Sequence, residues 1–129
     1  MTFSLHPQVV HFPIALLLIG SVLTILGLRR DRSDWLTISA FMLRLGWWTA
    51  LLASATGLLT VALNFAQAQR DAAWVNAHAA TSLIIVWVYW QLMPRANRPP
   101  RQHLHGFGII LIIVTGWLGG HIAHDLGWR

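Results

Sequence analysis

The chain has 129 residues, of which 56% are hydrophobic and only 10% are charged. This composition is too apolar for a soluble domain of this length, so it indicates an integral membrane protein. The nine basic residues are all arginines and lie mainly in short links between apolar runs, which favours membrane orientation over nucleic-acid binding. The absence of cysteine excludes disulfides, cysteine-ligated iron–sulphur clusters and covalently attached c-type haem.

The apolar runs predict four membrane spans. The first covers about residues 9–28 and ends at a charged link, residues 29–32. It lacks the basic start and the cleavage site of a signal peptide, so we expect it to be retained. Ser33 and Asp34 then offer a helix cap before a long apolar segment that Arg44 interrupts, so residues 35–43 are expected to form an interfacial lead-in and residues 45–65 the second span.

The second half of the chain predicts two more spans. Asp71 can cap a third span at about residues 72–92, and the proline-rich link of residues 94–101 cannot continue that helix. The fourth span covers about residues 105–122. Short links between four spans predict an all-α, integral membrane, antiparallel four-helix bundle in a single domain, residues 1–129.

Arginine placement predicts the orientation of this bundle. One face, called here the arginine face, holds most of them, while the opposite face, the N-terminal face, holds only Arg70 and Arg129. The positive-inside rule then makes the arginine face cytoplasmic and both termini periplasmic, in a bacterial inner membrane. Tryptophans near both boundaries are expected to form aromatic belts. The arginines of the arginine face are Arg29, Arg30, Arg32, Arg44, Arg95, Arg98 and Arg101.

Antiparallel threading gathers five of the seven histidines at the N-terminal face, and they come from three spans. A histidine in hydrocarbon is costly unless it binds or hydrogen-bonds something, so this convergence predicts a site. Gly116 and Gly120 lie beside it in a G-x-x-x-G pattern. This pattern favours close helix packing, but it also leaves room for a flat macrocycle. The five histidines are His6, His11, His78, His121 and His124.

Haem b suits these residues better than a zinc or copper ion, because zinc sites usually include cysteine or a carboxylate. Haem needs only two axial imidazoles and an apolar slot. His11 and His78 are the first choice of axial ligands to the haem iron and His121 follows, while His6 or His124 would serve a second haem. The alternative is that these histidines only cap helices and meet lipid headgroups.

The arginine face offers fewer candidate ligands for a cofactor. His103 and His105 have no histidine partner from another span, so a haem there would need an unusual ligand such as Met93. No phosphate-binding glycine loop, nucleophile with a base, or carboxylate pair is present, so independent catalysis is not expected.

Three motifs identify a resemblance that covers essentially the whole chain. They are H-P-x-x-V-H-F-P-I-A-L-L at residues 6–17, a histidine early in the third span at His78, and T-G-W-L-G-G at residues 115–120. With them the chain resembles a bacterial family of small four-span membrane proteins catalogued as a domain of unknown function. Where members often continue with a tyrosine and a His-Gly pair, this chain has His121-Ile-Ala-His124, so a ligand inferred from that pair does not transfer.

Family members occur fused or adjacent to Rieske and c-type cytochrome domains, so the resemblance implies a redox setting and a periplasmic c-type cytochrome or Rieske partner. The resulting hypothesis is an electron-transfer protein or subunit that binds one b-type haem, or two, near the periplasmic face. The alternative is a small structural subunit of a larger membrane complex, with histidines that are structural or ligate a pigment or metal ion.

Overall fold

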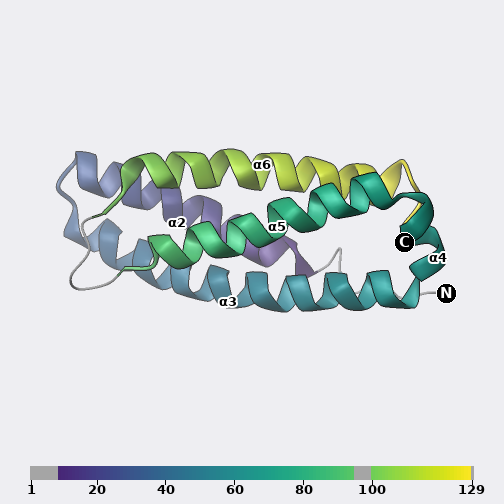
Figure 1. Cartoon of the computed structure of the whole chain (residues 1–129). Coiled ribbons are helices and arrows are strands. Elements are labelled where there is room, and N and C mark those ends of the chain that lie inside the picture. The colour runs from purple at the N-terminus through teal and green to yellow at the C-terminus, as the bar shows by residue number, and fades with distance from the viewer. Residues whose placement is uncertain (1–8, 95–99, 129) are drawn as a thin grey trace.

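The computed structural model describes residues 9–94 and 100–128 and forms an all-α bundle (Figure 1). His6 and the arginines Arg95, Arg98 and Arg129 lie outside the described residues. Four of the helices are long and apolar enough to cross a membrane, and a short helix precedes the third of them. The helices are α2 (His11–Arg29), α3 (Ser33–Leu63), α4 (Phe65–Arg70), α5 (Ala72–Leu92) and α6 (Gln102–His124).

The distribution of side chains is that of a protein surrounded by lipid. Large apolar residues point outward, with Phe41 68%, Leu58 72% and Leu63 75% exposed. The interior buries polar side chains, among them Ser21 and Thr24, beside hydrophobic residues such as Leu17. Because no aqueous protein stabilises such an apolar exterior, the predicted all-α membrane bundle is confirmed.

The α2–α3 hairpin is closed by a tight turn at the arginine face. Asp31 adopts a left-handed backbone conformation with φ of 50°, which aspartate tolerates better than most residues. This lets the Arg32 N–H donate to the Gly27 carbonyl at 2.9 Å, and the hydrogen bond satisfies one of the last free carbonyls of α2.

Helix α3 is continuous across Arg44, so the expected lead-in and second span form one helix of 31 residues. At 1.5 Å per residue it is about 46 Å long, against about 28 Å for the 19 residues of α2. A polar side chain on one face of a helix does not interrupt its backbone hydrogen bonds, which is why Arg44 causes no break. The helix ends at Leu63, two residues before the predicted boundary at residue 65.

The predicted caps are wrong, because the acids bind other partners. The Asp34 carboxylate accepts hydrogen bonds from the Arg32 guanidinium at 2.9 and 2.6 Å. Asp71 stands at the cap position of α5, but its carboxylate accepts the indole N–H of Trp128 at 2.8 Å. Trp128 is therefore buried in the fold, with 9% of its surface exposed, and is not a belt residue.

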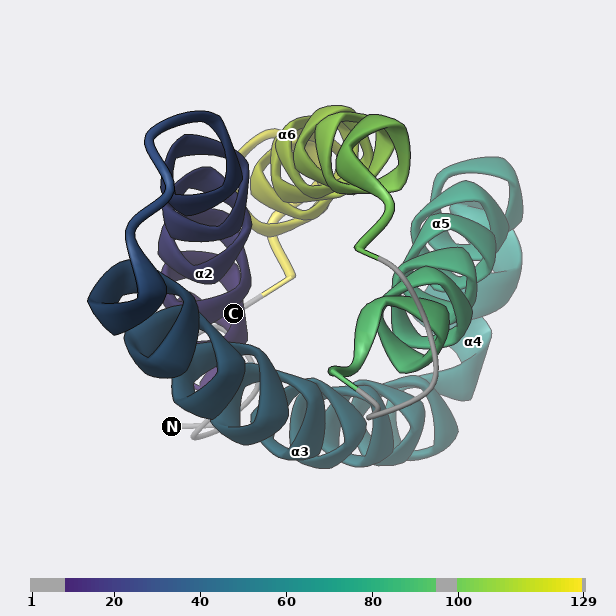
Figure 2. The same cartoon turned by 90° about the vertical axis from the view of Figure 1, so that its left-hand side faces the viewer.

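Small residues let the helices approach closely. A Cβ on Gly20 would lie 3.0 Å from Leu43, and one on Gly46 would lie 2.8 Å from Leu17, so in the packing of α2 and α3 each glycine makes room for a leucine of the other helix. Along the bundle axis, α2 contacts α3 and α6, while α5 contacts α6 and α3 (Figure 2). This arrangement leaves internal space among the four long helices, where the candidate site lies.

Candidate cofactor cavity

A cavity of about 290 Å³ lies among α2, α3, α5 and α6. Three histidines from three helices line it: His11 of α2, His78 of α5 and His124 of α6. The remaining lining is mostly aliphatic. His11 and His124 are 113 positions apart in the sequence but line the same cavity, as the antiparallel threading predicts. Apolar and small side chains complete the walls, including Ile14, Leu17, Ala50, Ala53, Ile85, Ile112, Gly116 and Gly120.

His11 is an exposed residue that lines the cavity, and along the bundle axis it lies farther from the N-terminal mouth than its sequence position suggested. Ser21 contacts His105, which sets the antiparallel register of α2 and α6. Ten residues back along α2, His11 is then level with Thr115 of α6. Thr115 precedes the end of α6 at His124 by about 14 Å. The difference arises because α2 begins well inside the span of α6.

The imidazole of His78 is held in one tautomer. Its Nδ1 lies 3.2 Å from the Thr115 carbonyl oxygen, and a carbonyl can only accept, so Nδ1 carries the proton. The lone pair then belongs to Nε2. Histidines that ligate metals nearly always donate the other ring N–H to a carbonyl or carboxylate in this way. His78 therefore has the hydrogen-bonding arrangement of a ligating histidine.

The glycines of α6 divide into two kinds. A Cβ on Gly119 would lie 3.0 Å from Cε1 of His78, so this glycine makes room for the imidazole ring. A Cβ on Gly116 or Gly120 would meet nothing within 4 Å among the described residues, and both glycines line the cavity. Close packing therefore explains the glycine at position 119, which the sequence did not single out. It does not explain Gly116 and Gly120, the two glycines of the G-x-x-x-G pattern.

Thr115 contributes a polar group that the sequence did not identify as functional. Its hydroxyl oxygen is buried and, within the described part of the chain, has no hydrogen-bond partner, although the residue lines the cavity. Buried hydroxyls in helices usually donate to a carbonyl one turn earlier, as Ser54 and Ser82 do here. An unsatisfied buried hydroxyl costs about 1–3 kcal/mol, so its presence beside a cavity suggests a missing partner.

His121 and His124 separate in the structure. His124 lines the cavity, whereas His121 lies outside the lining. The His121 Nδ1 is 2.5 Å from the Asp125 carboxylate, and its ring centroid is 4.3 Å from that of Trp74. The Asp125 side chain is 65% exposed, so this pair faces the outside of the bundle. The i, i+3 spacing does not bring both rings to one site.

His105, at the arginine end of the bundle, belongs to a buried hydrogen-bond network that the sequence analysis did not predict. His105 is 2% exposed, and its Nδ1 lies 3.2 Å from Oγ of Ser21. The Ser21 hydroxyl is in turn 2.8 Å from the hydroxyl of Tyr89. This network joins α2, α5 and α6. The sequence feature that could have predicted this network is the presence of Ser21 and Thr24 within an apolar run. Buried hydroxyl groups need hydrogen-bond partners, so these two residues imply polar partners on neighbouring helices.

Among residues 9–94 and 100–128, no group of three histidine or acidic side chains is placed to hold a metal ion.

Comparison with known proteins identifies the family. The family model described as "Predicted membrane protein (DUF2231)" matches residues 2–129. Searches of curated proteins and of solved structures each find no match. The match covers nearly the whole chain and agrees with the four apolar helices. The chain is therefore a member of the DUF2231 family of predicted membrane proteins.

Proposed function

We propose that this membrane bundle binds a b-type haem in the histidine-lined cavity and acts as an electron-transfer protein or as a subunit of a redox complex. The observation that carries the proposal is the convergence of His11, His78 and His124 on a mainly apolar cavity. At two of its lining glycines, Gly116 and Gly120, an added Cβ would meet no atom within 4 Å among the described residues. Bound haem b supplies reversible one-electron transfer, and the protein supplies its ligands and surroundings.

Each lining residue has a role in this proposal. His78 would present Nε2, with its tautomer fixed by the Thr115 carbonyl. His11, from the opposite hairpin, is the second axial candidate, and His124 lies nearer the mouth. Gly116 and Gly120 leave clearance that side chains would remove. This clearance matters because the cavity, at about 290 Å³, lies just below the range of about 300–1,000 Å³ that is typical of ligand pockets.

The same proposal places the chain in a bacterial inner membrane with its termini in the periplasm. It rests on the excess of arginine at the α2–α3 turn and the α5–α6 link. A periplasmic c-type cytochrome or Rieske protein would then be the electron partner. Single cysteines at Asp31 and Gln69, both exposed, should label oppositely with an impermeant thiol reagent on intact cells, and labelling of Asp31→Cys alone would reverse this orientation.

Two glycines of α6 allow a matched test of the cavity. Gly120 lines the cavity and Gly106 does not, and a Cβ on either meets nothing within 4 Å among the described residues. Both Gly120→Leu and Gly106→Leu should fold. With haem precursor supplied during expression, Gly120→Leu should lower Soret absorbance per folded protein, while Gly106→Leu should leave it unchanged.

The structural-subunit alternative predicts a different result. If the glycine serves only assembly, Gly120→Leu should weaken folding or complex formation with no haem to lose. Equal Soret absorbance in both leucine variants would remove the cavity as the haem site.

A further inference from the structure

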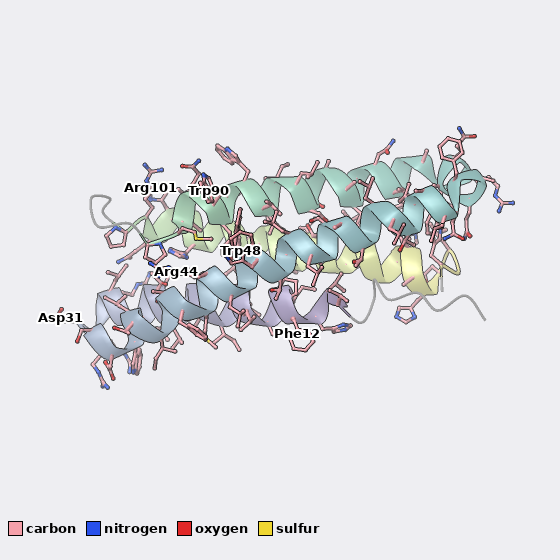
Figure 3. All side chains as sticks on the ribbon, turned by 90° about the horizontal axis from the view of Figure 1, so that it is seen from below. Phe12, Asp31, Arg44, Trp48, Trp90 and Arg101 are labelled. Atoms are coloured by element: carbon pink, nitrogen blue, oxygen red, sulfur yellow. The ribbon has the colours of Figure 1, made fainter. Side chains whose placement is uncertain are left out.

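A second cavity, of about 400 Å³, lies at the arginine end of the bundle. It is lined by residues of α2, α3 and α5 and by the beginning of α6, and it shares no residue with the histidine-lined cavity. Two arginines from separate elements contribute to its walls, Arg44 within α3 and Arg101 just before α6. Both lie toward the end of the bundle that carries Asp31 (Figure 3).

Within residues 9–94 and 100–128, no ion pair joins either of these arginines to a carboxylate. The chain contains only four acidic residues, and within the described ranges the ion pairs join other residues. No acid lines this cavity. The four acids are accounted for by Asp31 in the exposed turn, Asp34 bound to Arg32, Asp71 bound to Trp128 and Asp125 bound to His121.

Arg44 is unusual in its position as well as in having no ion pair among the described residues. It stands about 16 Å along α3 from Ser33, in an otherwise apolar stretch. An arginine at such a place in a membrane helix is costly, and such residues commonly mark a ligand site or pair with another group. A group bound in the cavity would lie beside both arginines, because both line its walls.

Two further features of the cavity favour an anion. Helix α6 begins there with no acid in its first turn, so the positive end of its dipole is not neutralised by its own sequence. His105 also lines the cavity. Its Nδ1 is engaged with Ser21. When Tyr89 donates to Ser21 and Ser21 donates to Nδ1, Nε2 carries a proton that it can donate to the cavity.

We propose that this second cavity binds a phosphate group, with Arg44 and Arg101 as its principal ligands and His105 as an additional donor. Arginine recognises phosphate through two parallel hydrogen bonds, and basic pockets between membrane helices on the cytoplasmic side bind phospholipid headgroups. The same chemistry would accept the phosphodiester of an anionic lipid or free phosphate. The site is independent of the haem proposal, because it shares no residue with that cavity.

The test uses the full-length protein purified in a neutral detergent. Native mass spectrometry measures the ratio of phosphatidylglycerol to phosphatidylcholine adducts, and the thermal midpoint is measured with and without inorganic phosphate. Wild type should prefer phosphatidylglycerol, and Arg44→Gln with Arg101→Gln should lower this preference about tenfold or more. Arg29→Gln with Arg30→Gln removes the same charge at the same end, outside the cavity, and should behave as wild type.

The two measurements distinguish a lipid headgroup from free phosphate as the bound group. A lipid preference without a response to inorganic phosphate identifies a headgroup site, and a raised thermal midpoint in phosphate, lost only in the Arg44 and Arg101 variant, identifies a free-anion site. Arg44→Lys keeps the charge but loses the bidentate fork, so it should fold and bind several-fold more weakly. The absence of both responses in wild type, or an equal loss in the Arg29 and Arg30 control, would overturn the proposal.

Discussion

The contact between Gly108 and Tyr89 gives a sharp test of how the bundle is packed. A Cβ on Gly108 would lie 2.8 Å from the Tyr89 hydroxyl oxygen and 3.0 Å from two carbons of its ring. Tyr89 is 1% exposed and its hydroxyl is bound to Ser21 at 2.8 Å, so the ring cannot swing away without loss. Overpacking costs about 1–3 kcal/mol, and a broken hydrogen bond adds about 0.5–1.5 kcal/mol. Alanine also gains up to about 1 kcal/mol in helix propensity over glycine. Gly108→Ala should therefore lower the free energy of unfolding by about 0.5–3.5 kcal/mol.

The control is Gly106→Ala on the same helix. Among the described residues a Cβ there meets nothing within 4 Å, so its stability should be unchanged or raised by up to about 1 kcal/mol. Reversible unfolding in mixed micelles, followed by tryptophan fluorescence, measures both. Tyr89→Phe removes the closest atom, so the double variant with Gly108→Ala should be less destabilised than the sum of the two changes. Equal stability of Gly108→Ala and Gly106→Ala would refute the packing described for α5 and α6.

Three further predictions concern the histidine-lined cavity. His11→Ala or His78→Ala should remove or alter the absorbance of bound haem, whereas His103→Ala should leave it nearly unchanged; loss in His103→Ala alone would move the site to the arginine face. Gly119→Ala should displace the His78 ring, since its Cβ would lie 3.0 Å away, and shift the haem spectrum, which an unaltered spectrum would contradict. Thr115→Val removes a buried hydroxyl that has no partner in the described residues, so the haem-free protein should be as stable as wild type or more stable, as thermal unfolding would show.

The overall architecture could be predicted from the sequence because membrane helices have a strong signal. Runs of apolar residues, charged links and prolines define the ends of the long helices to within a few residues, although the predicted interruption at Arg44 was wrong. Antiparallel threading predicted that five histidines would gather, and His11, His78 and His124 line the cavity while His121 does not. Helix ends were less predictable. Asp34 and Asp71 looked like caps, but whether an acid caps a helix depends on which partner reaches it in the folded chain.

The details of the site depend on how each helix is rotated about its axis and on how far neighbouring helices are offset along the bundle. Neither quantity can be read from a single sequence. His121 and His124 are three residues apart, but only His124 reaches the cavity, because the rotation of α6 turns His121 toward Trp74. The depth of His11 follows from the offset between α2 and α6, set by contacts such as that between Ser21 and His105. The orphan hydroxyl of a threonine likewise becomes visible only when its surroundings are known.

The most direct test of the central claim is an absorption spectrum of the purified wild-type protein, expressed with haem precursor and recorded before and after dithionite. Haem held by His11 and His78 predicts a Soret band that shifts and sharpens on reduction, with visible bands typical of a six-coordinate b-type haem. Folded, monodisperse protein with no Soret band in either state would contradict the assignment of the histidine-lined cavity as a haem site.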